Sequence, residues 1–119
     1  MMKRVLVVDD EPSVIGVLLR ILRAEGCEAV GAASAEEALD LVAKGNFGLI
    51  LMDVVLPGMT GFGAIAALRR RCSAPVLLMS GDANDDNTKD AVLLGAIGMI
   101  RKPIDVQELQ RVVRGLELT

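Results

Sequence analysis

The chain alternates short apolar runs with longer segments in which apolar residues recur at helical spacing. Apolar runs without alternation are typical of strands buried on both faces, and spacings of three and four residues are typical of helices packed on one side. The pattern predicts strands over 5–8, 27–32, 49–53, 76–79 and 97–100. It predicts helices from Pro12 up to Gly26, from Ser34 to Ala43, from Gly61 to Arg71, over about 88–94 and over about 105–116.

Residues typical of helix ends support these boundaries. Pro12 suits the first turn of a helix, and Gly26 suits the position just after one. Ser34 and Glu37 have the spacing of a capping box, in which each side chain satisfies a backbone N–H at the start of a helix.

Strand and helix alternate five times, with short connections and no linker or internal repeat. This order predicts a parallel sheet covered by helices on both faces. We therefore expect an α/β fold of the flavodoxin-like, doubly wound (βα)5 kind, with five parallel strands in the order 2-1-3-4-5. Residues 1–119 are expected to form a single domain, and the weak strand 27–32 is expected near a sheet edge.

The amino-acid composition excludes several classes of protein and of functional site. The chain is 52% hydrophobic but has only two aromatic residues, Phe47 and Phe62, so the core must be aliphatic. A net charge of −3 argues against direct nucleic-acid binding, for which a basic surface is expected. There is no His, and Cys27 and Cys72 form no motif, which excludes His-dependent triads and a structural zinc site. No apolar run approaches the roughly 18 residues that cross a membrane, so we expect a soluble, cytoplasmic protein.

Polar residues stand where the predicted strands end. In doubly wound sheets, ligands bind outside the carboxyl ends of the strands, near the point where strand order reverses. Asp53 follows four apolar residues, and a carboxylate at the end of a buried strand must be solvated, paired or bound to metal. The other predicted strand ends bring Asp9 and Asp10, Ser80, and Lys102 to the same edge.

These residue types suggest phosphoryl transfer. Clustered carboxylates repel one another unless a cation joins them, and ligands that are all oxygens favour a hard cation such as Mg²⁺. Asp53 could then act as a nucleophile and form an aspartyl phosphate. Ser80 could donate a hydrogen bond to a phosphoryl oxygen, and Lys102 could pair first with Asp53 and later with the phosphoryl group.

Taken in order, four motifs that span essentially the whole chain resemble those of a response-regulator receiver domain of two-component signalling: Asp9-Asp10-Glu11-Pro12, Met52-Asp53-Val54-Val55-Leu56-Pro57-Gly58-Met59-Thr60-Gly61, Ser80-Gly81 and Lys102-Pro103. The resemblance implies that Asp53 accepts a phosphoryl group from a histidine kinase or phosphotransfer protein. It implies Mg²⁺ held by Asp10, Asp53 and the main-chain carbonyl of Val55, with Asp9 acting mainly through water. It gives Ser80 the role of switch hydroxyl and Lys102 that of the pairing lysine.

Two features depart from or qualify the family pattern. Met99 stands where the family usually carries Tyr or Phe, three residues before the Lys of the Lys-Pro pair. We interpret Met99 as a core methionine next to a switch face that couples differently to phosphorylation. The alternative interpretation is a weakened switch in a module that mainly passes phosphate onward. Val55 and Asp82 lie at family positions that face the hydrolytic water, and Val55 cannot position water. Slow dephosphorylation is therefore predicted.

Alternative readings of the site residues stay open. Asp53 could be a solvated strand-end residue, Asp9 and Asp10 helix N-terminal acids, Ser80 a turn serine and Lys102 a surface lysine. A second function is a Mg²⁺-dependent phosphohydrolase of the haloacid-dehalogenase-like kind, but those enzymes need an acid where this chain has Val55. A third is a vestigial receiver that binds partners without phosphorylation.

The output of the predicted switch is not visible in the sequence. The resemblance implies no enzymatic turnover beyond self-phosphorylation and self-dephosphorylation. It implies that the face built from the fourth helix, fifth strand and fifth helix signals to an output domain or effector protein. Homodimerisation, and whether the chain is free-standing or a fragment, stay open.

Overall fold

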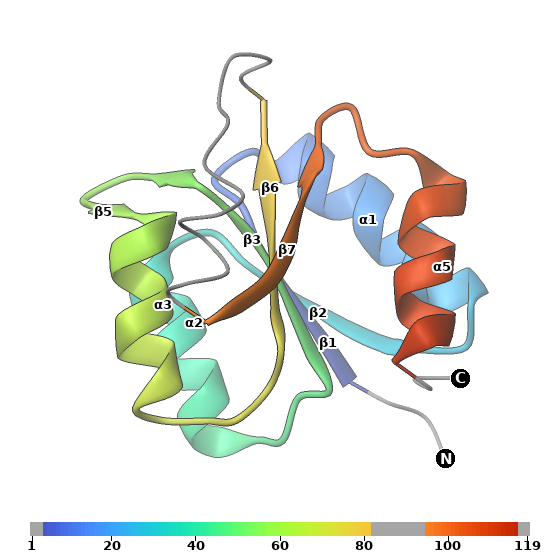
Figure 1. Cartoon of the computed structure of the whole chain (residues 1–119). Helices are drawn as coiled ribbons and strands as arrows, with labels where there is room; N and C mark the ends of the chain where they lie inside the picture. Colours follow the sequence, from blue (N-terminus) through green and yellow to red (C-terminus); the bar gives the residue numbers. More distant parts are fainter. Residues whose placement is uncertain (1–3, 82–94, 117–119) are drawn as a thin grey trace.

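The computed structural model of the chain describes residues 4–81 and 95–116 (Figure 1). Five strands form one sheet in which every neighbouring pair is parallel, in the order β2-β1-β3-β6-β7. Counted along the chain, these five strands have the predicted order 2-1-3-4-5, with β2 at an edge as expected. Their bounds are β1 Arg4–Val8, β2 Glu28–Ala32, β3 Leu49–Asp53, β6 Val76–Ser80 and β7 Ala96–Arg101.

Helices cover both faces of the sheet, with α1 and α5 on one side and α2 and α3 on the other (Figure 1). Their bounds are α1 Pro12–Ala24, α2 Ala35–Lys44, α3 Gly61–Arg69 and α5 Val106–Gly115. The third helix thus ends two residues earlier than predicted, with the N–H groups of Arg71 and Cys72 donating to the carbonyl of Leu68. The helix predicted over 88–94 lies outside the described residues.

The central strands are apolar on both faces, which explains their continuous hydrophobic runs. Neighbouring residues of a strand point to opposite faces, so each strand contributes to two cores. One core lies on the α2 and α3 side and includes Leu6, Val8, Ile50, Met52, Val76 and Leu78. The other lies on the α1 and α5 side and includes Val5, Val7, Leu49, Leu51, Leu77 and Met79.

A small antiparallel hairpin after β3 is the main feature that the hydrophobic pattern did not predict. It consists of β4 (Val55–Leu56) and β5 (Met59–Thr60), joined by Pro57 and Gly58. Gly58 has φ +76°, and Pro followed by a Gly with positive φ is a sequence that favours a type II turn. The hairpin directs the chain away from Asp53 and into α3.

The predicted capping box forms at the start of α2. The N–H of Glu37 donates to Ser34 Oγ over 3.1 Å, and Glu37 Oε2 accepts from the N–H of Ala33 over 3.1 Å. The reciprocal bond therefore reaches the residue before the N-cap, but it still satisfies a backbone donor at the helix end.

The two cysteines differ in burial and are expected to differ in reactivity. Cys27 is only 1% exposed, and burial, together with the nearby charge of Glu25, raises the pKa of its thiol. Because the thiolate is the reactive form, we expect a disulfide reagent at neutral pH to modify half-buried Cys72 first, with Cys27 at least about tenfold slower.

Cysteine-to-serine variants assign the fast and the slow phase of thiol modification to the two residues. In Cys72→Ser only the slow phase should be left, and in Cys27→Ser only the fast one. Denaturant should make the rates converge, because unfolding exposes both thiols. Equal rates in the folded protein would contradict the expected protection of Cys27.

Candidate functional site

The predicted site residues meet at the carboxyl edge of the sheet. Asp9 directly follows β1, Asp53 ends β3, Ser80 ends β6 and Lys102 directly follows β7. Parallel strands all point their carboxyl ends to one edge, so four distant segments converge there. Backbone hydrogen bonds continue past the strand ends, including Lys102 N to the Ser80 carbonyl at 2.8 Å. The backbone that carries these side chains is therefore held by the sheet.

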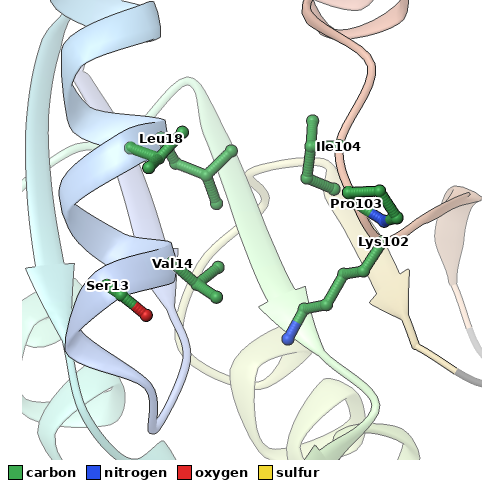
Figure 2. Close-up of a pocket in the computed structure, with 7 residues that line it drawn as sticks. Ser13, Val14, Leu18, Lys102, Pro103 and Ile104 are labelled. Atoms are coloured by element: carbon green, nitrogen blue, oxygen red, sulfur yellow. The ribbon is translucent and has the colours of Figure 1, made fainter.

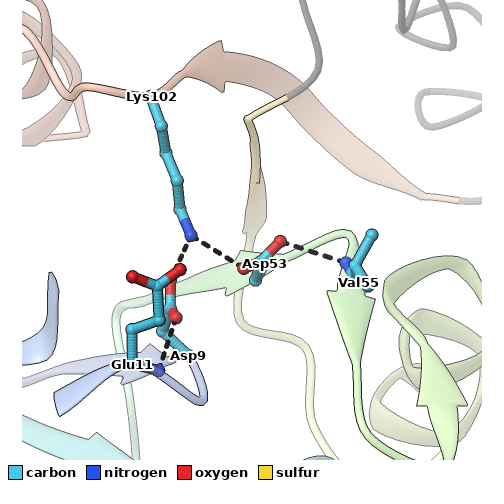
Figure 3. Close-up of polar contacts among 5 residues, drawn as sticks. All are labelled: Asp9, Glu11, Asp53, Val55 and Lys102. Carbon is cyan, nitrogen blue, oxygen red and sulfur yellow. Dashed lines mark hydrogen bonds and ion pairs between the residues drawn. The ribbon is translucent and has the colours of Figure 1, made fainter.

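Lys102 joins two of the carboxylates. Its Nζ lies 2.6 Å from Asp9 Oδ2 and 2.7 Å from Asp53 Oδ2 (Figure 3). The other oxygen of each carboxylate is held by a backbone N–H two residues later, from Glu11 to Asp9 Oδ1 at 2.9 Å and from Val55 to Asp53 Oδ1 at 3.0 Å. Each carboxylate thus has one oxygen on the ammonium and one on the backbone, which fixes its orientation.

Burial makes these charges strongly interdependent. Asp9 is 0% and Asp53 7% exposed, and the Lys102 side chain is 16% exposed. Burial alone lowers the pKa of Lys102, but the hydrogen bonds with Asp53 and Asp9, and the negative charges of both, outweigh it and raise that pKa. The ammonium is therefore charged throughout the neutral range.

The stem of Lys102 lies beside an apolar cavity between α1 and the segment that leads into α5. The cavity has a volume of about 280 Å³ and is lined by Ser13, Val14, Val17, Leu18, Lys102, Pro103 and Ile104. Lys102 extends from beside Pro103 toward the end of β3 (Figure 2). The aliphatic stem can therefore contact apolar side chains while its charged end reaches the carboxylates.

A second cavity, which we call the acceptor cavity, opens over Asp53. It has a volume of about 310 Å³ and is lined by Glu11, Asp53, Val54, Val55, Ser80, Gly81 and Lys102. Ser80 is 2% exposed, whereas Val55 is 73% exposed. The cavity therefore has a polar floor of Asp53, Ser80 and Lys102 next to an apolar, exposed Val55.

Glu11 is the cavity residue that the sequence did not single out. In the sequence it stands within the motif Asp9-Asp10-Glu11-Pro12 without a predicted role. The available signal was Pro12, which places Glu11 immediately before α1 and so beside the end of β1. Asp82, in contrast, lies outside the described residues, so its predicted place near the site stays a prediction.

The site has the donor set of a hard-cation centre. Asp9, Asp10 and Asp53 each offer a carboxylate oxygen, and these three oxygens lie within 4.8 Å of one another. Asp10 is exposed, so the cluster is open to solvent on one side. Three carboxylates face one ammonium, and oxygen-only ligands with excess negative charge fit Mg²⁺. The residues present thus fit the predicted metal, while the predicted role of the Val55 carbonyl stays a prediction.

Comparison with known proteins identifies the family. The family model of the response regulator receiver domain matches residues 5–114. The chain belongs to this family. It is therefore a receiver domain of two-component signalling, a signalling module rather than a conventional enzyme. Response regulators work with histidine kinases and output domains.

Curated relatives are similar over nearly all of this chain. It is 34% identical over 111 residues to the transcriptional regulatory protein YvrH of Bacillus subtilis, covering 92% of this chain and 47% of YvrH. It is 34% identical over 117 residues to the DNA-binding response regulator MtrA of Mycolicibacterium smegmatis, covering 96% of this chain and 50% of MtrA. The chain thus spans about half the length of these relatives.

Solved structures confirm the flavodoxin-like fold. A CheY-like receiver domain protein of Methanospirillum hungatei matches with a TM-score of 0.87 and 30% identity, covering 98% of this chain and 95% of that one. Chemotaxis response regulator CheY4 of Vibrio cholerae matches with a TM-score of 0.87 and 29% identity, covering 98% and 99%. Within the described part of the receiver, no helix is long and apolar enough to span a membrane.

Met99 packs against the core as predicted for a core methionine, while its predicted effect on the switch face stays a prediction. It is half-buried, lies opposite Leu78 in the sheet and packs against the core on the α2 and α3 side. The flexible thioether fills space there in place of an aromatic ring. Met99 therefore contributes to the core of the receiver at the position that usually carries a ring.

Proposed function

We propose that this receiver accepts a phosphoryl group on Asp53 from a phosphohistidine of a histidine kinase or phosphotransfer protein, with residues 1–119 acting as one unit. The observation that supports this most is the placement of Asp53. Its carboxylate lines the acceptor cavity, held between Lys102 Nζ and the N–H of Val55 and grouped with two further carboxylates. An oriented nucleophile next to a cation is what phosphoryl transfer requires.

In the proposed reaction, an oxygen of Asp53 bonds to phosphorus while the bond from phosphorus to the donor nitrogen breaks. Ser80 donates a hydrogen bond to a phosphoryl oxygen, and Lys102 offsets the charge that the group brings into a largely buried site. Asp10, Asp53 and the Val55 carbonyl would hold Mg²⁺, with Asp9 acting mainly through water. Bound there, the metal neutralises charge on the phosphoryl oxygens.

Lys102 is also the proposed link to the output. It directly follows β7, an edge strand, and precedes the segment leading into α5. Phosphorylation converts the Asp53 carboxylate into an acyl phosphate, and the new phosphoryl oxygens compete with the Asp9 carboxylate for the ammonium. Movement of Lys102 would therefore shift β7 and the start of α5, which form part of the proposed signalling face toward an output domain or effector. The fourth helix of that face lies outside the described residues.

Incubation with acetyl phosphate and Mg²⁺ tests the proposal by intact-protein mass spectrometry. We expect a gain of one phosphoryl group that requires Mg²⁺ and that hydroxylamine removes, because acyl phosphates react with hydroxylamine and phosphoserine does not. Continuous release of inorganic phosphate without a stable adduct would favour a phosphohydrolase. Neither an adduct nor phosphate release would favour a vestigial receiver that acts by binding alone.

Val55→Asn is expected to shorten the lifetime of the phosphorylated receiver. Val55 is 73% exposed at the acceptor cavity and offers no polar group to a water molecule approaching the phosphoryl group. An amide there can orient that water, and one hydrogen bond gained in the transition state gives an acceleration of about tenfold. The half-life is measured after removal of excess donor.

The matched control for Val55→Asn is Val106→Asn, an equally polar change at an exposed valine outside the acceptor cavity. Its phosphoryl half-life should equal that of the natural chain. A Val55→Asn half-life that is equally unchanged would show that Val55 does not limit hydrolysis.

A further inference from the structure

Glu11 and Asp10 are neighbours in sequence but line different hollows. Glu11 lines the acceptor cavity together with Asp53, Ser80 and Lys102. Asp10 instead lines a groove that also includes Glu37 at the start of α2. Glu11 is exposed, so it lies where the acceptor cavity meets solvent. Asp53, which lines the same cavity, is only 7% exposed.

The backbone of Glu11 is held on both sides. Its N–H donates to Asp9 Oδ1 over 2.9 Å, and its carbonyl accepts from the N–H groups of Val14 and Ile15 at 3.1 and 3.2 Å. Pro12 follows, with its restricted φ. The Glu11 side chain makes no capping hydrogen bond to the first turn of α1 and extends toward Lys102 (Figure 3). The carboxylate is thus kept at the cavity by its backbone and is not used to cap the helix.

Among the residues that the structure describes, no ion pair balances the charge of Glu11. Lys102 pairs with Asp9 and Asp53, and within the described part of the chain Glu11 has no cationic partner within 4.0 Å. The Asp9 and Asp53 carboxylates, which contact Lys102, already offset its charge. Glu11 therefore adds net negative charge at the mouth of the cavity, where field lines are concentrated by the surrounding protein.

We propose that Glu11 is a specificity residue that disfavours small, highly charged phosphoryl donors at Asp53. The inference rests on the proposed function. A free dianion is repelled by Glu11 as it enters, whereas a protein donor can place a cationic side chain opposite that carboxylate. The site thereby discriminates by donor charge, in favour of phosphoryl groups presented on a protein surface.

Two small donors of different charge make the proposal testable. With acetyl phosphate, a dianion, an Asp53 oxygen bonds to phosphorus and acetate leaves with the electrons of the broken phosphorus–oxygen bond. With phosphoramidate, a monoanion at neutral pH, the phosphorus–nitrogen bond breaks and ammonia leaves with its protons. Both reactions end in the same aspartyl phosphate, so only the charge of the incoming donor and its leaving group differ.

The experiment measures kcat/KM for phosphorylation of the natural chain and of Glu11→Gln, Glu11→Asp and Glu28→Gln, with Mg²⁺ at low and high ionic strength. We expect Glu11→Gln to raise kcat/KM for acetyl phosphate about fivefold at low salt, with a smaller gain for phosphoramidate. The gain should vanish near 1 M salt, where screening acts within a few ångströms. Glu11→Asp keeps the charge and should stay slow.

Glu28→Gln is the matched control. It removes the same charge from an exposed residue that begins β2, at the opposite end of the sheet, so its rates should equal those of the natural chain. Two results would overturn the role of Glu11 but not the proposed function, provided that the natural chain is phosphorylated. One is that Glu11→Gln is no faster than the natural chain. The other is that it is faster by the same factor with both donors and at all salt concentrations. No phosphorylation of any chain overturns the proposed function and this inference together.

Discussion

Asp53→Asn is expected to take up no phosphoryl group under conditions that fully convert the natural receiver. The amide keeps the size of the carboxylate and an oxygen that can accept from the N–H of Val55, so the local backbone should be retained. The amide lacks the anionic oxygen that would attack phosphorus, so no aspartyl phosphate can form. The loss should be complete by intact-protein mass spectrometry with acetyl phosphate and Mg²⁺.

Asp40→Asn is the control for this loss. Asp40 is exposed on α2 and lines none of the cavities at the site, so its variant should be phosphorylated like the natural chain. Circular dichroism should show both variants folded. An undiminished adduct on folded Asp53→Asn would place the acceptor elsewhere and refute the assignment of Asp53.

Lys102→Met is expected to lower the free energy of unfolding by about 3 kcal/mol at neutral pH, since removing one partner of a buried ion pair leaves charge uncompensated. The ammonium lies 2.6 Å from Asp9 and 2.7 Å from Asp53, and Asp9 is 0% exposed. Met preserves most of the apolar stem, so the loss reports mainly on charge. Urea denaturation without Mg²⁺ measures it.

The pH dependence of this loss follows from the raised pKa of Lys102 in the folded chain. A pKa raised by folding gives stability that is fully present below the unfolded value, about 10.4 for lysine. That stability is lost as pH rises through the folded value. The difference between the natural chain and Lys102→Met should therefore be constant near neutral pH and shrink in strong alkali.

Lys44→Met provides the comparison for Lys102→Met. Lys44 is an exposed residue in the last turn of α2, where its loss should change the free energy of unfolding by less than about 1 kcal/mol. If Lys102→Met cost no more than Lys44→Met, the two ion pairs of Lys102 would not stabilise the fold.

Much of the architecture could be predicted from local patterns. The runs 5–8, 49–52 and 76–79, which lie within β1, β3 and β6, are apolar at every position, as is typical of strands covered on both faces. Asp53, Ser80 and Lys102 then had to converge, because parallel strands end at one edge. The hairpin of β4 and β5 escaped prediction, since two-residue strands are too short to show a period.

The sequence by itself determined the order of the elements, the two-sided core and the set of polar residues at one edge, because each depends on local composition and chain order. The sequence also predicted the pair of Lys102 with Asp53, but only the tertiary structure decided the other pairings of these polar groups. Asp53 and Lys102 are 49 positions apart, and Lys102 turned out to join Asp9 as well as Asp53. The tertiary structure also placed Glu11 in the lining of the acceptor cavity, next to the cluster formed by the carboxylates of Asp9, Asp10 and Asp53. These contacts depend on the directions of side chains and on the distances between separate strands. Strand register and helix packing set those distances, and no local sequence pattern encodes them.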